Sequence, residues 1–180
     1  MVSSSTSAVL RNQAGRYTAE KLAWRGNGPG KGGFIVNIRW SPDTSPTSTD
    51  FIGLCANGLP NATPEDNVNS IGIIKRTGDT NYQLFTCGAT TAERSIFDLG
   101  TAFSARATGT IFTLCLFCDP NASTIGFSIS SLETGAAVSG TFVVNLPVNN
   151  VFMALAAITG NTILSAAVMN IRSFECWTPY

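Results

Sequence analysis

Short apolar runs separated by Pro, Gly, Asn and Asp make up most of this 180-residue sequence. In the run FIVNIRW, Phe34, Val36, Ile38 and Trp40 alternate with more polar positions, which is the pattern of a half-buried β-strand. The dividing residues tolerate turn dihedrals. Further strands are predicted at Thr49–Ala56, Ser70–Arg76, Asn81–Cys87, Thr110–Cys118, 124–130, 140–146 and Val151–Ile158.

Two segments need separate treatment. Thr110–Cys118 is apolar on both faces apart from Thr113, so we expect a central strand that is covered on both sides. Asn161–Trp177 fits a helical period as well as a strand period. Its β-branched and aromatic residues and its strand-forming neighbours favour a strand.

This number of strands needs two stacked sheets to bury the apolar faces. The predicted fold is therefore all-β, an antiparallel β-sandwich of jelly-roll type over residues 24–180. Residues 1–23 contain few large apolar side chains and many Ser and Thr, which predicts an extended N-terminal arm that docks elsewhere.

Charge is sparse and balanced. Lys plus Arg and Asp plus Glu both number 11, and only 12% of residues are charged. No net field steers the protein towards nucleic acid or anionic lipid, and we expect neither partner. The longest apolar run, Val151–Ile158, is too short for a membrane helix, and no secretory signal is visible.

A glycine-rich stretch, RGNGPGKGGF, places Gly28, Gly30 and Gly33 in a G-x-G-x-x-G pattern. A dinucleotide site would require this pattern to open a helix, but a predicted strand follows. The Walker pattern also fails, because Lys31 is followed by Gly32. We therefore expect no cofactor and explain the glycines by a sharp turn into the first strand.

Five cysteines lie in apolar segments: Cys55, Cys87, Cys115, Cys118 and Cys176. Free buried thiols explain them best, and disulfides are the alternative. The pair Cys115–Cys118 lacks a second ligand pair, and its two side chains point to opposite faces of a strand. No metal site is predicted.

The chain contains no histidine, which excludes Ser-His-Asp and Cys-His catalysis. Carboxylates remain, but Glu65 and Asp66 lie in a Pro- and Asn-rich loop, where solvated turn residues are common. No catalytic pair is recognisable, so we predict that the protein is not an enzyme.

Two long loops, SPDTSPTSTD and NGLPNATPEDNVN, are where a rigid sandwich would carry recognition. The candidate contact residues are Asp43, Thr44, Ser45, Thr47, Asn61, Thr63, Glu65, Asp66 and Asn67. Near the chain ends, Trp24, Trp177 and Tyr180 are candidate subunit contacts. Packing within the chain is an equal alternative for these aromatic residues.

Four stretches together resemble a domain of phage tail-fibre and related virion proteins: WRGNGPGKGGF, GDTNYQLF, FDLGTAF and FECWTPY. The resemblance covers nearly all of the chain after Ala23. Phe97 is a departure, because it interrupts the apolar-Asp-Leu-Gly run that is more usual there.

The resemblance implies a virion component, made in the host cytoplasm: a β-sandwich knob, trimeric, that touches the host surface or decorates the particle. We expect a non-enzymatic tail-fibre or appendage module that binds a host glycan or protein and contacts other virion proteins through its arm. A capsid decoration or head-fibre protein is the alternative. A glycan-degrading tailspike is a second alternative.

Overall fold

The computed structural model describes residues 2–3, 12–17, 23–42, 47–57, 63–105, 109–161 and 167–179. Within these ranges the chain forms thirteen β-strands and two three-residue 3-10 helices. The first strands are β1 (Val2–Ser3), β2 (Asn12–Tyr17), β3 (Phe34–Ser41), β4 (Ser48–Cys55), β5 (Ser70–Lys75), β6 (Gln83–Cys87) and β7 (Arg94–Asp98). The remaining elements are β8 (Phe112–Cys118), β9 (Ile125–Ser131), β10 (Ala137–Phe142), β11 (Ala154–Asn161), β12 (Ala167–Val168), β13 (Asn170–Trp177), η1 (Pro64–Asp66) and η2 (Thr101–Phe103).

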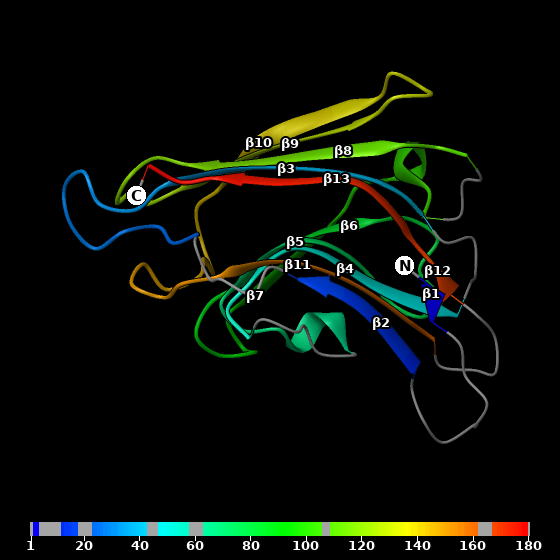
Figure 1. The fold of residues 1–180 in the computed structure, drawn as a ribbon, viewed down its shortest axis with the longest axis horizontal. Coiled ribbons are helices and arrows are strands. Elements are labelled where there is room, and N and C mark those ends of the chain that lie inside the picture. Colours follow the sequence, from blue (N-terminus) through cyan, green and yellow to red (C-terminus); the bar gives the residue numbers. More distant parts are fainter. Residues whose placement is uncertain are drawn as a thin grey trace.

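Two sheets face each other (Figure 1). One has five strands in the order β10-β9-β8-β3-β13, and the other has six in the order β2-β11-β4-β5-β6-β7. Strand β1 pairs with β12, and every pairing is antiparallel. The predicted all-β antiparallel sandwich is confirmed. Within the described ranges no helix is long and apolar enough to cross a membrane.

The main core lies between the sheets. The alternating side chains of β3 that the sequence placed on one face are all buried there. Rings of Trp40, Tyr82 and Phe112 meet with centroids 5.6 to 5.7 Å apart. Each fully buried large apolar side chain contributes about 1.5–3 kcal/mol, so this packing is the main force that holds the sheets together.

A buried polar row crosses the core side of the six-stranded sheet, where Thr159, Asp50 and Lys75 are cross-strand neighbours. The Asp50 carboxylate accepts hydrogen bonds from the Thr159 hydroxyl at 2.7 Å and the Tyr82 hydroxyl at 3.2 Å. Lys75 donates to the Ser48 hydroxyl. These bonds offset the cost of removing the charged groups from water.

The outer face of the six-stranded sheet carries a second apolar cluster. Phe51, Ile74 and Phe85 are fully buried there, and Val68 packs on them from the loop that follows η1. Figure 1 shows η1 on the side of this sheet that faces away from the five-stranded sheet. Strands β4 and β5 are therefore covered on both faces.

Strand β8 is central, as predicted, but the expectation that both of its faces are covered is wrong. Its core face is buried, whereas Phe117 on the other face is 47% exposed. The sheet that has strands covered on both faces is the six-stranded one, because the loop between β4 and β5 packs on its outer face.

The chain before Trp24 also differs from expectation. Asn12–Tyr17 was expected to be part of an arm outside the sandwich, but it pairs with β11 as an edge strand. Backbone pairing alone can add an edge strand, so a low apolar content did not exclude it. The boundary of the arm at residue 23 stays a prediction.

Two strand predictions near the C-terminus need correction. The strand expected at 140–146 is β10, Ala137–Phe142, and it ends before Asn145, which has a φ of 54°. Asn161–Trp177 was expected to be one segment, but it contains the end of β11, then β12 and β13, while residues 162–166 lie outside the described ranges.

The glycine-rich stretch forms a tight crossing of two backbone segments. Gly26 and Gly32 have φ angles of 100° and 80°. A Cβ at Gly26 would overlap the carbonyl oxygen of Lys31, and one at Gly32 would overlap the backbone of Gly26. Only glycine fits these two positions, as the conformational explanation predicts.

We expect Gly26→Ala to lower the free energy of unfolding by about 3 kcal/mol, because both the backbone dihedral and the close approach disfavour a side chain. Gly30→Ala is the matched control: its φ is 68° and the space around it is open, so it should cost only about 1–2 kcal/mol. Urea unfolding followed by tryptophan fluorescence measures both. Equal losses would contradict the close approach.

Candidate functional site

One end of the sandwich gathers several loops: 24–33, 63–69, 88–93, 119–124 and 143–153. The Arg25 guanidinium joins three of them, because it donates to the carbonyl oxygens of Pro147 at 2.9 Å and Ala122 at 2.7 Å. The amide of Gly26 donates to the carbonyl of Asn149 at 2.9 Å. These hydrogen bonds hold the connected loops in place relative to one another.

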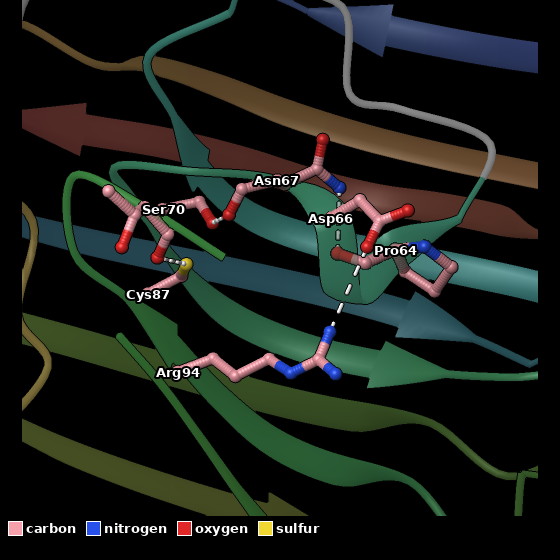
Figure 2. A network of polar contacts seen from close by, with 7 residues as sticks. Pro64, Asp66, Asn67, Ser70, Cys87 and Arg94 are labelled. Atoms are coloured by element: carbon pink, nitrogen blue, oxygen red, sulfur yellow. Dashed lines mark hydrogen bonds and ion pairs between the residues drawn. The ribbon is translucent and has the colours of Figure 1, made fainter. Parts of the chain in front are cut away.

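The loop around η1 is held in shape by hydrogen bonds from its own side chains (Figure 2). Asn67 donates from Nδ2 to the Pro64 carbonyl at 2.8 Å and closes the turn. Asn69 has a φ of 46°, and its side-chain oxygen accepts the amide of Val148 at 2.9 Å. The loop is thus tied to the 143–153 connection.

Four of the candidate contact residues are described in this loop. Asp66 is exposed and lies 3.8 Å from Arg94 of β7, an ion pair that is visible in Figure 2. Thr63 and Glu65 are half-buried. Asn67 is fully buried because its side chain holds the turn, so its assignment as a contact residue is wrong.

In the other candidate loop, SPDTSPTSTD, Thr47 is the one candidate contact residue that the structure describes. Thr47 precedes β4 and the η1 loop follows it, so the two loops lie at opposite ends of an eight-residue strand, roughly 25 Å apart at about 3.3 Å per residue. Asp43, Thr44, Ser45 and Asn61 lie outside the described residues. Among the described candidates, Thr47 therefore does not share a surface with Thr63, Glu65 and Asp66.

The described candidate subunit contact residues, Trp24 and Trp177, do not lie together. Trp24 stacks on Phe152 with ring centroids 4.7 Å apart, which is packing within the chain. Trp177 is 51% exposed on the outer face of the five-stranded sheet. Tyr180 lies outside the described residues.

A cleft of about 480 Å³ opens where β7 and β10, the edge strands of the two sheets, face each other. Leu84, Phe97, Phe127, Val138 and Phe142 supply most of its apolar wall. Phe97 is 60% exposed. None of the residues that line the cleft is charged.

Sequence reasoning missed this cleft, because its walls come from strands far apart in the chain. The one available signal was Phe97. It stands out as an unexpected aromatic residue in the stretch IFDLG, and it now forms one side of the cleft.

The aromatic wall opposite Phe97 depends on a glycine. Phe127 and Phe142 lie with ring centroids 4.9 Å apart. A Cβ at Gly140 would lie 2.9 Å from the Phe127 ring, so the missing side chain leaves room for that ring at the cleft. A larger residue at position 140 would displace Phe127.

Asn145 holds the cleft at its base. Its left-handed backbone lets the side-chain Nδ2 donate to the Ser95 hydroxyl at 2.9 Å while its carbonyl accepts the Thr86 hydroxyl at 2.9 Å. Thr86 is fully buried in β6 and Ser95 lies in β7. The connection after β10 is thereby fastened to the opposite sheet, which fixes the spacing of the two walls.

All five cysteines are free thiols. Cys55, Cys87 and Cys118 are buried as predicted, whereas Cys115 and Cys176 are half-buried. Burial raises the pKa of the thiols of Cys87, Cys115, Cys118 and Cys176 above the ordinary value. For Cys118 the neighbouring Arg25 partly opposes that rise in pKa.

Metal-binding chemistry is not visible in the part of the chain that the structure describes. No group of three or more Cys, Asp or Glu side chains there is placed to hold an ion. Cys115 and Cys118 lie on opposite faces of β8, as their spacing predicts.

No protein-family model matches the sequence, and no curated protein matches it. Among solved structures, the chain is similar to lectin UEA-II complexed with galactose, at 8% identity and a TM-score of 0.64, over 98% of this chain and 85% of that one. It is also similar to arcelin-5, a lectin-like defence protein from Phaseolus vulgaris, at 8% identity and a TM-score of 0.58, over 100% and 92% of the two chains. These similarities show the shared jelly-roll β-sandwich fold.

We expect the native thiols to react slowly with a disulfide reagent at pH 7, because burial limits access and the raised pKa values keep the thiolate fraction low. The rate should increase as the pH rises towards those pKa values, and all five thiols should react at once in urea. Rapid labelling of the native protein at pH 7 would contradict this arrangement.

Proposed function

We propose that this protein is a non-enzymatic carbohydrate-binding module of a phage virion appendage, with the β7–β10 cleft as its binding site. The observation that carries this proposal is the uncharged cleft with aromatic rings on both walls. The hydrogen bond from Asn145 to Ser95 and the missing side chain at Gly140 set the positions of the two walls.

The chemistry of the cleft suits a neutral sugar ring. A pyranose presents an apolar C–H face that packs on an aromatic ring, and Phe97 offers such a ring to solvent. The Ser95 hydroxyl supplies a polar group at the base. A volume of about 480 Å³ lies in the range of small-ligand sites, which combine apolar walls with few polar groups.

The virion setting is supported by the resemblance of the glycine-rich entry, the stretch that contains Phe97 and the C-terminal strand to tail-fibre domains. The jelly-roll fold, which is also that of a lectin solved with galactose, is compatible with a receptor-binding role. On this proposal the protein lies on the particle surface and binds a host glycan. A head-fibre or capsid decoration protein would carry the same module elsewhere on the particle, and the trimer stays a prediction.

Absence of catalysis is part of the proposal. The carboxylate nearest to Phe97 in the chain is Asp98, whose Oδ1 accepts the amide of Gly100 at 2.6 Å and Nδ2 of Asn81 at 3.1 Å. Asp98 therefore holds a turn. A glycosidase needs two carboxyl groups that flank the bond to be broken, and the lining of this cleft contains none.

We expect Phe97→Ala to weaken binding of the best neutral oligosaccharide from a glycan array by up to about tenfold, since one aromatic contact is worth about 0.5–1.5 kcal/mol. Gly140→Val should also weaken it, because the new side chain displaces Phe127. Leu132→Ala is the control: it removes an exposed apolar side chain outside the cleft lining and should leave affinity unchanged. Titration calorimetry measures all three variants.

Two results would overturn this assignment. If Asp66→Asn or Arg94→Ala abolished binding while Phe97→Ala did not, the η1 loop would be the site. If the protein released reducing ends from the bound oligosaccharide, it would be a glycan-degrading enzyme.

A further inference from the structure

The cleft lies between two strand edges. β7 ends the six-stranded sheet and β10 ends the five-stranded sheet, so within the described ranges each has a neighbouring strand on one side only. Such a strand directs every second residue's backbone N–H and C=O into its ladder and the others away from it. The residues that carry the outward groups determine what the cleft can bind through hydrogen bonds.

The turn between β9 and β10 shows which residues of β10 these are. The amide of Ser131 donates to the carbonyl of Ala136 at 2.9 Å, so the backbone of Ala136 points towards β9. The direction alternates along an antiparallel ladder, and the register of the two strands is regular. Ser139 and Thr141 therefore turn their N–H and C=O groups towards the free edge.

Two hydrogen bonds beyond the ends of β7 settle its direction in the same way. The carbonyl of Glu93 accepts the amide of Gly88 at 2.7 Å, and the amide of Leu99 donates to the carbonyl of Tyr82 at 3.1 Å. The odd-numbered residues of β7 therefore point towards β6, whose register with β7 is regular. Ile96 turns its N–H and C=O groups away from β6, towards the free edge.

Ile96, Ser139 and Thr141 all line the cleft, although their side chains lie on the outer faces of the two sheets. Ile96 packs on the second apolar cluster. In β10, Val138 and Phe142 pack on the main core, so the side chains between them point the other way. The backbone of these three residues therefore borders the cleft, and it offers N–H donors and C=O acceptors from two edges.

This set of groups does not match a sugar that carries only hydroxyls. Each hydroxyl both donates and accepts, and carboxylate, carboxamide and guanidinium side chains are the groups that pair with several hydroxyls at once. None of the described residues that line the cleft has such a side chain. The apolar walls and the backbone groups instead suit a ligand that presents an amide and a methyl group.

We propose, on the basis of the carbohydrate-binding function proposed above, that the sugar bound in this cleft carries an acetamido group, as the 2-acetamido-2-deoxyhexoses do. A trans amide directs its N–H and C=O to opposite sides, as a strand between two neighbours does. The acetamido carbonyl accepts the N–H of Ser139 or Thr141, and the acetamido N–H donates to the carbonyl of Ile96. The methyl group packs on the apolar wall that includes Leu84, while the pyranose ring stays on Phe97.

The first test compares methyl glycosides on the wild-type protein by titration calorimetry. The probes are N-acetylglucosamine, glucosamine and glucose, the same three sugars of the galactose series, and the 6-deoxyhexose fucose. In at least one series we expect the acetamido sugar to bind at least about ten times more tightly than the parent hexose, because it adds hydrogen bonds and a buried methyl group. The amino sugar should show no gain, because it has neither the carbonyl nor the methyl and places a charge against apolar walls.

The second test removes single backbone donors. Ser139→Pro and Thr141→Pro each delete an outward N–H and leave the ladder to β9 intact, and an edge strand tolerates proline at such a position. One of the two should reduce the preference for the acetamido sugar over the parent hexose to less than about twofold. Ser139→Ala and Thr141→Ala are the matched controls, because they keep the N–H and should keep the preference. Urea unfolding establishes that each variant is folded, and the wild-type comparison decides the matter if the proline variants are not.

The outcomes separate this inference from the proposed function. If the parent hexose or fucose binds as tightly as the acetamido sugar, and Phe97→Ala weakens that binding, the cleft is a sugar site but the acetamido inference is wrong. If no sugar binds, both are wrong. A preference that survives in both folded proline variants would also overturn the inference. So would binding of an extended peptide in place of the glycosides, because the free edges would then serve strand addition.

Discussion

The apolar packing between the two sheets is the interaction on which the rest of the molecule depends. Alternating side chains of β3 and β8 are buried against those of β4 and β5, and an aromatic cluster around Trp40 fills the centre. Once these strands are fixed in register, the positions of all the edges and outer faces follow. The buried hydrogen bonds of Asp50 add specificity, because any shift in register would leave its carboxylate without partners.

The two sheets use their remaining surfaces differently. The six-stranded sheet covers its outer face with the η1 loop, which builds a second core around Phe51 and Phe85. On the outer face of the five-stranded sheet the described residues Ile35, Phe117 and Trp177 are exposed, and the aromatic cleft lies at the edge between β7 and β10. The cleft and this outer face therefore lie on opposite sides of β10.

Local patterns predicted the fold well. The alternation of Phe34, Val36, Ile38 and Trp40 identified one strand and its buried face, and turn residues separated most of the others. Features that depend on partners distant in sequence were missed. Strand β2 needs the edge of β11, the burial of Asn67 needs the turn it closes, and the cleft needs β6, β7, β9 and β10 together. No local pattern encodes contacts between strands that are distant in sequence, although the unexpected Phe97 lies at one such contact.

The place of β11 in the six-stranded sheet has a consequence for biosynthesis. It lies between β2 and β4, and so joins the start of the chain to a segment near its end. While the protein is being translated, β2 has no partner in this sheet and β4 has only β5 until the ribosome has released residues 154–161. The nascent chain therefore carries unpaired strand edges for most of its synthesis, and this is the period in which it is most exposed to aggregation and to assistance by chaperones.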